Sequence, residues 1–162
     1  MVGKRGVHVV CVAPPTIGGM GVVARTEGSE LRKRGWKAVL ASPWSSDTDD
    51  SVRLASWFSC GYASLVSPFQ FLKLFGSYDL IHLHYPFYGT AEMIALLDQC
   101  VGLPPMVVTA HMDAHAVGWK EQAFECHRRW IQPHLLSRAK IILVSSLDYA
   151  ANSSYAPYRS NI

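Results

Sequence analysis

The chain has 162 residues, of which 49% are hydrophobic and 17% are charged, and its formal net charge is +3. A chain of this length forms one domain with a core of its own, and its apolar content excludes disorder over most of the sequence. No apolar run approaches the roughly 18 residues that a membrane-spanning helix needs. The small basic excess lies in short groups of Lys and Arg, which is typical of helix ends and does not predict a nucleic-acid surface.

The cysteines indicate a reducing compartment. Four are present, at Cys11, Cys60, Cys100 and Cys126. They lie far apart and form no Cys-x-x-Cys pair, so neither a disulfide framework nor a structural zinc site is expected. Cys11 and Cys126 fall in apolar patterns, and we expect both to be buried. The apolar run after Lys4-Arg5 is short and ends at two prolines, which disfavours a secretory signal.

Short apolar runs rich in β-branched residues predict five strands. They are Val7–Ala13, Trp36–Ala41, Tyr78–His84, Met106–Ala110 and Ile141–Ser145. Most of these runs are continuous rather than alternating, which is typical of strands buried on both faces.

Helical spacing predicts three helices between the strands, over Gly21–Arg34, Thr90–Val101 and Trp119–Ser137. The last of these should break near Pro133. Its apolar residues recur at the spacing of one helix face: Trp119, Ala123, Cys126, Trp130 and Ile131. Alternating strands and helices predict an α/β fold, with an open, mostly parallel sheet and helices on both faces, in a single domain over residues 1–162.

The region of residues 42–77 carries the weakest pattern. It suggests a polar loop over Ser45–Ser51, a strand near Val52–Trp57 and a short helix near Pro68–Phe75. The apolar residues beside Lys73 either dip into a membrane interface or face the core, and they are Phe69, Phe71, Leu72, Leu74 and Phe75.

Ligands of an open parallel sheet bind beyond the carboxyl ends of its strands, where three glycines follow the first strand. Gly18, Gly19 and Gly21 let backbone amides approach an anion at a helix N-terminus. A dinucleotide site would also need an acidic residue about 20 positions on. Positions 41–43 are instead Ala, Ser and Pro, so no nicotinamide or flavin cofactor is expected. The glycines contact an anion or a sugar, or they only form a tight turn.

Histidines gather near two strand ends. His82 and His84 share a strand face, and His111, Asp113 and His115 follow a neighbouring apolar run. A neutral imidazole can donate to a sugar hydroxyl or stabilise developing charge. The spacings also resemble metal-ligand pairs, so a metal-dependent hydrolase is an alternative, but no tight metal motif is present and we expect no metal. Three further histidines should be structural or surface residues: His8, His127 and His134.

Four segments occur in a characteristic order. They are Gly18–Gly21 leading to Arg34-Gly35-Trp36, then Tyr78–Pro86, Val107–Asp113 and Ile141–Tyr149. Together they resemble the N-terminal domain of retaining GT-B glycosyltransferases of family 4, over nearly the whole chain. The resemblance implies a Rossmann-like half-enzyme that holds the acceptor while a sugar moves from a nucleotide-sugar donor, with retention, to a lipid, a sugar or a small molecule.

The resemblance also assigns residues. It implies that His111 is the catalytic contact to the donor sugar near the reacting carbon. Gly18, Gly19 and Gly21 would lie close to the donor phosphates or the acceptor. The remaining substrate-binding residues would be His84, Tyr85, Asp113 and Ser145.

The family's donor-binding glutamates, eight positions apart, and its phosphate-binding Arg/Lys pair belong to a second domain. No two glutamates of this chain are eight apart. We therefore expect the donor-binding domain to lie outside the chain, as a partner or a further segment, and the chain alone to be inactive. The alternative is a Rossmann-like module that binds a sugar or nucleotide without chemistry. We expect a cytoplasmic protein with no nucleic-acid partner, and peripheral contact with the inner membrane face is left open.

Overall fold

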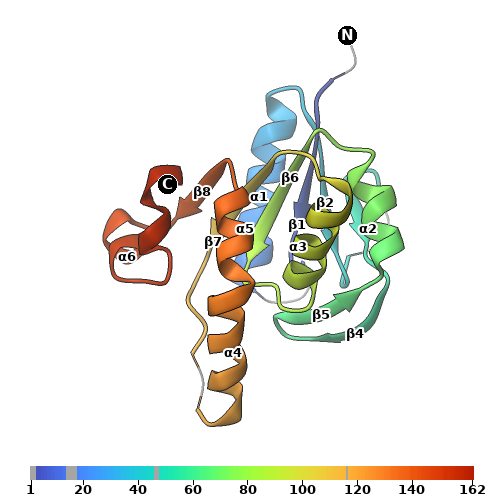
Figure 1. The fold of residues 1–162 in the computed structure, drawn as a ribbon. Helices are drawn as coiled ribbons and strands as arrows, with labels where there is room; N and C mark the ends of the chain where they lie inside the picture. Colours follow the sequence, from blue (N-terminus) through green and yellow to red (C-terminus); the bar gives the residue numbers. More distant parts are fainter. Residues whose placement is uncertain (1–2, 14–17, 46–47, 116) are drawn as a thin grey trace.

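A computed structural model describes residues 3–13, 18–45, 48–115 and 117–162 (Figure 1). Its main sheet has six strands, all parallel, in the order β3-β2-β1-β6-β7-β8. These strands are β1 (Arg5–Val9), β2 (Lys37–Ser42), β3 (Ser51–Arg53), β6 (Leu80–Tyr85), β7 (Met106–Ala110) and β8 (Ile141–Val144). The predicted open parallel sheet is confirmed.

The helices are α1 (Gly19–Lys33), α2 (Pro68–Phe75), α3 (Thr90–Val101), α4 (Trp119–Trp130), α5 (Gln132–Arg138), α6 (Leu147–Ala151) and the 3₁₀ helix η1 (Ala156–Asn161). Helix α1 lies on one face of the sheet, and α3 and α5 lie on the other (Figure 1). Among the described residues, no helix combines the length and the apolar character needed to cross a bilayer.

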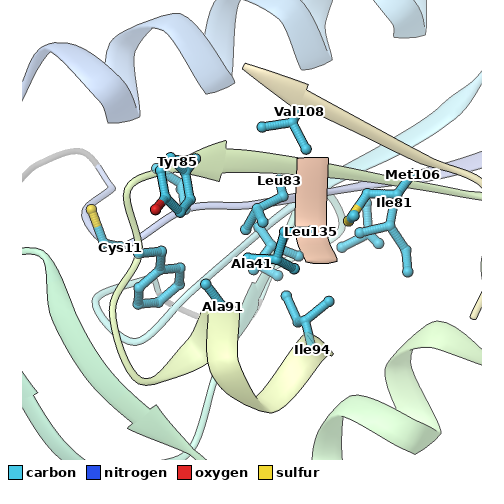
Figure 2. Close-up of a cluster of buried hydrophobic side chains, with 14 of the residues drawn as sticks. Cys11, Ala41, Ile81, Leu83, Tyr85, Ala91, Ile94, Met106, Val108 and Leu135 are labelled. Atoms are coloured by element: carbon cyan, nitrogen blue, oxygen red, sulfur yellow. The ribbon is translucent and has the colours of Figure 1, made fainter. Parts of the chain in front are cut away.

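The main core lies between the sheet and helices α3 and α5. Ile81 and Leu83 of β6 are fully buried there, with Ile94 of α3 and Leu135 of α5 (Figure 2). Burying one such aliphatic side chain is worth roughly 1.5–3 kcal/mol. Because side chains alternate along a strand, this packing turns the intervening β6 residues, two histidines, toward α1.

The structure corrects the predicted strand over Val52–Trp57. Two strands occur there, β3 and β4 (Ser56–Cys60), and they belong to different sheets. Strand β4 pairs antiparallel with β5 (Ala63–Val66), and Gly61, with a φ of 55°, occupies the turn between them. A positive φ suits glycine, which lacks a Cβ. The hairpin could not be recognised from the hydrophobic pattern of the sequence, because its two strands are short and half polar.

Helix α4 presents its aromatic stripe to solvent. Trp119 and Trp130 are 73% and 69% exposed, and Cys126, which was expected to be buried, is exposed as well. The helix extends past the carboxyl edge of the sheet (Figure 1). His127 is its buried residue. The predicted break is confirmed, since α4 ends at Trp130 and α5 begins at Gln132.

The apolar residues of α2 divide between core and surface. Phe71, Leu74 and Phe75 are buried, which favours the core-facing alternative for this helix, whereas Phe69 and Leu72 are exposed. The edge strand β8 is buried on one face only. Its residues Ile141 and Leu143 are exposed on the face that points away from α5.

Candidate functional site

The arrangement of β1, β6 and β7 brings histidines from three strands to one face of the sheet. His8 of β1 is the register partner of His82 of β6. His84, two residues along β6, is the partner of Thr109 of β7, and His111 follows that strand. All of these side chains lie on the α1 side. His8 and His82 lie at one level of the sheet, His84 and Thr109 lie nearer the carboxyl edge, and His111 lies beyond them.

The imidazoles form a chain of contacts. Nδ1 of His8 lies 3.1 Å from Nε2 of His84, and Nδ1 of His84 lies 3.1 Å from Nε2 of His111. The His82 ring stacks on His84, with centroids 4.7 Å apart, and its Nε2 lies 2.7 Å from Oγ1 of Thr109. A neutral imidazole has one donor nitrogen and one acceptor nitrogen, so each ring can donate to the next. The expectation that His82 and His84 face the same way is confirmed.

Burial keeps these rings neutral at neutral pH. Burial, together with a smaller contribution from the nearby Arg32 guanidinium, lowers the pKa of His8 to about 4. It also lowers the pKa of His82 to about 3, with smaller contributions from His8 and His111. The pKa of His84 lies well below its ordinary value, and that of half-buried His111 is lowered too, in both cases chiefly through burial. The cluster therefore offers neutral donors and acceptors rather than imidazolium charges.

Glu27 of α1 completes the cluster on the side that faces the helix. Its Oε2 lies 3.6 Å from Nε2 of His82 and 3.7 Å from Nε2 of His84. Burial raises the pKa of this carboxyl. The positions of Glu27 and His8 in this cluster are not apparent from the sequence alone. The one indication in the sequence is that His8 falls in a buried strand. Placing it beside His82 and His84 requires knowledge of the strand order β1-β6-β7, which the hydrophobic pattern does not reveal.

The glycines lie at the same edge of the sheet, at the start of α1. Gly18 is the N-cap residue, and a Cβ there would come within 2.9 Å of Cγ2 of Val12. Gly19 is exposed, and a Cβ there would meet nothing within 4 Å, whereas Gly21 is buried. The first amides of a helix have no intrahelical partner, so this end of α1 can receive an anion. Residues 14–17 of the loop lie outside the described residues.

Asp113 lies just beyond His111 but is engaged elsewhere. Its Oδ1 accepts from the hydroxyl of Ser154 at 2.5 Å, and its Oδ2 accepts from the backbone N–H of Ser154 at 2.9 Å. Tyr155 adds a hydrogen bond from its hydroxyl to the carbonyl oxygen of Met112 at 3.1 Å. These contacts tie the C-terminal segment to the loop that carries His111.

Tyr85 lies on the opposite face of the sheet from His84, as strand alternation requires. Its ring stacks on His127, and its hydroxyl donates to Oε1 of Gln132 at 3.4 Å. The side chain is buried, and burial raises its pKa. Ser145 follows β8 at the same edge as the glycines and is exposed. The structure thus joins His84 to His111 directly and turns Tyr85 away from both.

Comparisons with known proteins agree with this architecture. The sequence model described as Glycosyltransferase Family 4 matches residues 17–152. Among curated proteins, none matches the chain. The catalytic domain of starch synthase IV from Arabidopsis thaliana, bound to ADP and acarbose, is similar with a TM-score of 0.58 at 16% identity, over 98% of this chain and 49% of that one.

An alpha-glucosyltransferase in complex with UDP and a 13-mer DNA is similar with a TM-score of 0.56 at 16% identity, over 95% of this chain and 39% of that one. At this identity the likeness concerns the fold. The chain spans less than half the length of either structure.

Proposed function

The chain belongs to Glycosyltransferase Family 4, and from this membership we propose that it forms the acceptor-side half of a retaining enzyme that transfers a sugar from a nucleotide-sugar. The acceptor is a lipid, a sugar or a small molecule. The observation that carries the proposal is the family match over residues 17–152 together with a polar carboxyl edge that holds His84, His111 and the glycines.

His111 is the residue proposed to act on the donor sugar. Its Nε2 is engaged with Nδ1 of His84, which leaves Nδ1 of His111 for a substrate. When His84 donates to His111, Nδ1 of His111 carries the proton and can donate to a sugar hydroxyl or to developing charge. The lowered pKa of His111 suits this role, because a neutral ring placed in advance reorganises little during the reaction.

The glycines would serve the anionic part of the donor. Gly18 and Gly19 begin α1, where the amides and the helix dipole favour negative charge. Two structurally similar proteins carry UDP and ADP, which is consistent with a nucleotide-sugar donor. Ser145 would contact the acceptor. Asp113 would contribute by holding the segment around Ser154 in place beside the acceptor.

The donor-binding half is proposed to come from a second domain or partner, so that this chain alone does not catalyse transfer. We also propose that the protein is cytoplasmic. The free cysteines support this location, and they are Cys11, Cys60, Cys100 and Cys126. Peripheral contact with the inner membrane face is supported by exposed Trp119 and Trp130, each with a cation near its ring, Lys120 and Arg129 respectively.

A transfer assay tests the proposal. Labelled nucleotide-sugars are supplied to the chain alone and to the chain mixed with a donor-side GT-B domain, with lipid and sugar acceptors. We expect label in the acceptor only in the mixture. His111→Ala should lower kcat by about 10²–10³, the cost of removing one preorganised donor.

The matched control is His115→Ala, an exposed histidine in the same loop region. It should leave transfer close to that of the wild type. Transfer that survives His111→Ala unchanged would remove the proposed role, and absence of transfer with every donor and acceptor would favour a binding module.

A further inference from the structure

Three histidines and one glutamate place four potential metal-ligand atoms together beneath α1. The residues are His8, His82, His84 and Glu27, and their ligand atoms all lie within 4.8 Å of one another. The histidines are buried in the sheet, while the Glu27 side chain is 31% exposed. The proposed glycosyl transfer uses none of these four atoms directly.

Three of the six separations are close to those of ligands that share one ion, and all six are within 4.8 Å. In a tetrahedral zinc site the bonds to nitrogen and oxygen are about 2.0–2.1 Å, so neighbouring ligand atoms lie about 3.3–3.4 Å apart. Nδ1 of His8 and Nε2 of His84 are 3.1 Å apart. Oε2 of Glu27 lies 3.6 Å from Nε2 of His82 and 3.7 Å from Nε2 of His84. Three edges of the cluster are therefore within a few tenths of an ångström of a coordination tetrahedron.

Hydrogen bonding within the protein does not account for the glutamate. Oε2 of Glu27 is buried and has no hydrogen-bond partner among the described residues. The 3.6–3.7 Å separations from the two imidazole nitrogens are too long for a hydrogen bond. A buried carboxylate oxygen left unpaired costs free energy, and a bound ion is one recognised way to remove that cost.

The surrounding charges tolerate a cation. Arg32 lies beside His8, but its guanidinium donates to the carbonyl oxygen of Ala38 at 2.8 Å and pairs with Asp50 at 3.6 Å. The carboxylate of Glu27 lies on the solvent side of the cluster. A crevice lined by His8, Gly28 and Arg32 reaches the cluster from the β2–β3 side. Gly28 lies over the His8 ring, where a Cβ would come within 3.6 Å of that ring.

The geometry points to a divalent first-row metal site, suited best to Zn²⁺, formed by His8 Nδ1, His82 Nε2, His84 Nε2 and Glu27 Oε2. Imidazole and carboxylate donors in a compact tetrahedral set suit this ion. Four protein ligands leave no open position, so the ion holds α1 against β1 and β6 and does not activate water. This separates the site from the metal-dependent hydrolase considered from the sequence.

Binding would break two hydrogen bonds. The bond between Nδ1 of His8 and Nε2 of His84 is lost because both nitrogens become ligands, so the proton of His8 moves to its Nε2. The stacked rings of His82 and His84 also have to tilt so that their Nε2 atoms converge on the ion. Nε2 of His82 also contacts Oγ1 of Thr109 at 2.7 Å, so the threonine hydroxyl has to turn away when the metal takes that nitrogen. A metal on Nε2 of His84 leaves the proton on Nδ1, which then donates to Nε2 of His111. Metal ligands commonly donate their second ring N–H in this way.

The test is a titration of the chelator-treated, untagged chain with Zn²⁺ against a competing chromophoric chelator. We expect one equivalent to bind and the thermal midpoint of unfolding to rise. Glu27→Gln should weaken binding more than about 100-fold, beyond the 10–100-fold typical of changes in residues that support a ligand. Substitution with Co²⁺ should give the visible bands of a four-coordinate ion without the thiolate charge-transfer band that exposed cysteines would produce.

The matched control is Glu92→Gln, because Glu92 pairs with a buried histidine elsewhere, Oε1 lying 2.6 Å from Nδ1 of His127. It should leave zinc affinity unchanged. If Glu27→Gln fails to fold, imidazole nitrogen NMR of the wild type decides, since Zn²⁺ should fix the tautomers of three histidines. Absence of stoichiometric binding, equal losses in both variants, or a thiolate spectrum would each overturn the proposal.

Discussion

Acidification should destabilise the metal-free chain through the histidine cluster. Burial depresses the pKa of His8 to about 4 and that of His82 to about 3 in the folded state, whereas both titrate near 6.5 when unfolded. The unfolded chain therefore binds more protons than the folded chain below about pH 6.5, and stability falls as the pH falls. The loss continues down to about pH 4 for His8 and about pH 3 for His82.

The size of the effect follows from those pKa values. At about pH 5, an imidazole of pKa 6.5 is protonated in the unfolded chain, while the same ring is still largely neutral in the folded chain. This difference lowers the free energy of unfolding by about 2 kcal/mol for each such ring. His8 and His82 together should lower the free energy of unfolding by roughly 4 kcal/mol relative to about pH 7. His84 adds to this loss because its pKa is also lowered. Glu27 acts in the opposite direction, since its pKa is raised.

Urea unfolding in the presence of a chelator, followed at a series of pH values, measures this loss. His8→Leu should reduce the decrease between about pH 7 and about pH 5 by about 2 kcal/mol, because one of the titrating rings is gone. His115→Gln, which removes an exposed imidazole, is the control and should leave the decrease unchanged. A wild-type stability that stays flat over this range, or an unaltered decrease in His8→Leu, would contradict this role of the histidine cluster.

Three substitutions test local packing and hydrogen bonding. Gly89→Ala should cost more than about 2 kcal/mol in urea unfolding, because Gly89 has a φ of 77° and a Cβ would lie 2.6 Å from the carbonyl oxygen of Ser64. Gly102→Ala, at a φ of 66° with nothing within 4 Å of the added Cβ, should cost only about 1 kcal/mol, and equal costs would contradict the clash. Asp113→Asn should cost about 1 kcal/mol and speed amide exchange at Ser154, because neutral hydrogen bonds replace charge-assisted ones, and unchanged exchange would contradict this role.

The parallel sheet was predictable because its strands are buried on both faces over much of the sheet and read as continuous apolar runs. Helix α3 was predicted at its observed bounds, Thr90–Val101, since its spacing is clear and glycine lies at both ends. The ends of the strands were less predictable. The run Val7–Ala13 continues past the end of β1 at Val9, because buried loop residues such as Val10 and Cys11 are as apolar as strand residues.

The stripe on α4 shows what periodicity alone leaves open. Trp119 and Trp130 have the spacing of a buried face, yet that face is exposed because the helix projects beyond the sheet. An amphipathic pattern states which residues share a face but does not say what covers that face. The same limit hid the contact between Asp113 and Ser154, which are 41 positions apart.

The candidate site was predictable in part. The pairing of His82 with His84 follows from strand alternation, and the position of His111 follows from the end of a strand. The approach of His8 and Glu27 depends on which strands are neighbours and on where α1 crosses them. Those are properties of the whole fold, and no local pattern carries them.

Nuclear magnetic resonance of the isolated chain tests whether the carboxyl edge of this sheet holds the acceptor. Amide spectra are recorded while lipid and sugar acceptors, and then nucleotide-sugars, are added. We expect the largest shifts at Gly19, His111 and Ser145, and we expect His111→Ala to weaken them. Shifts confined to the opposite edge, near Arg5 and Lys37, would contradict this expectation.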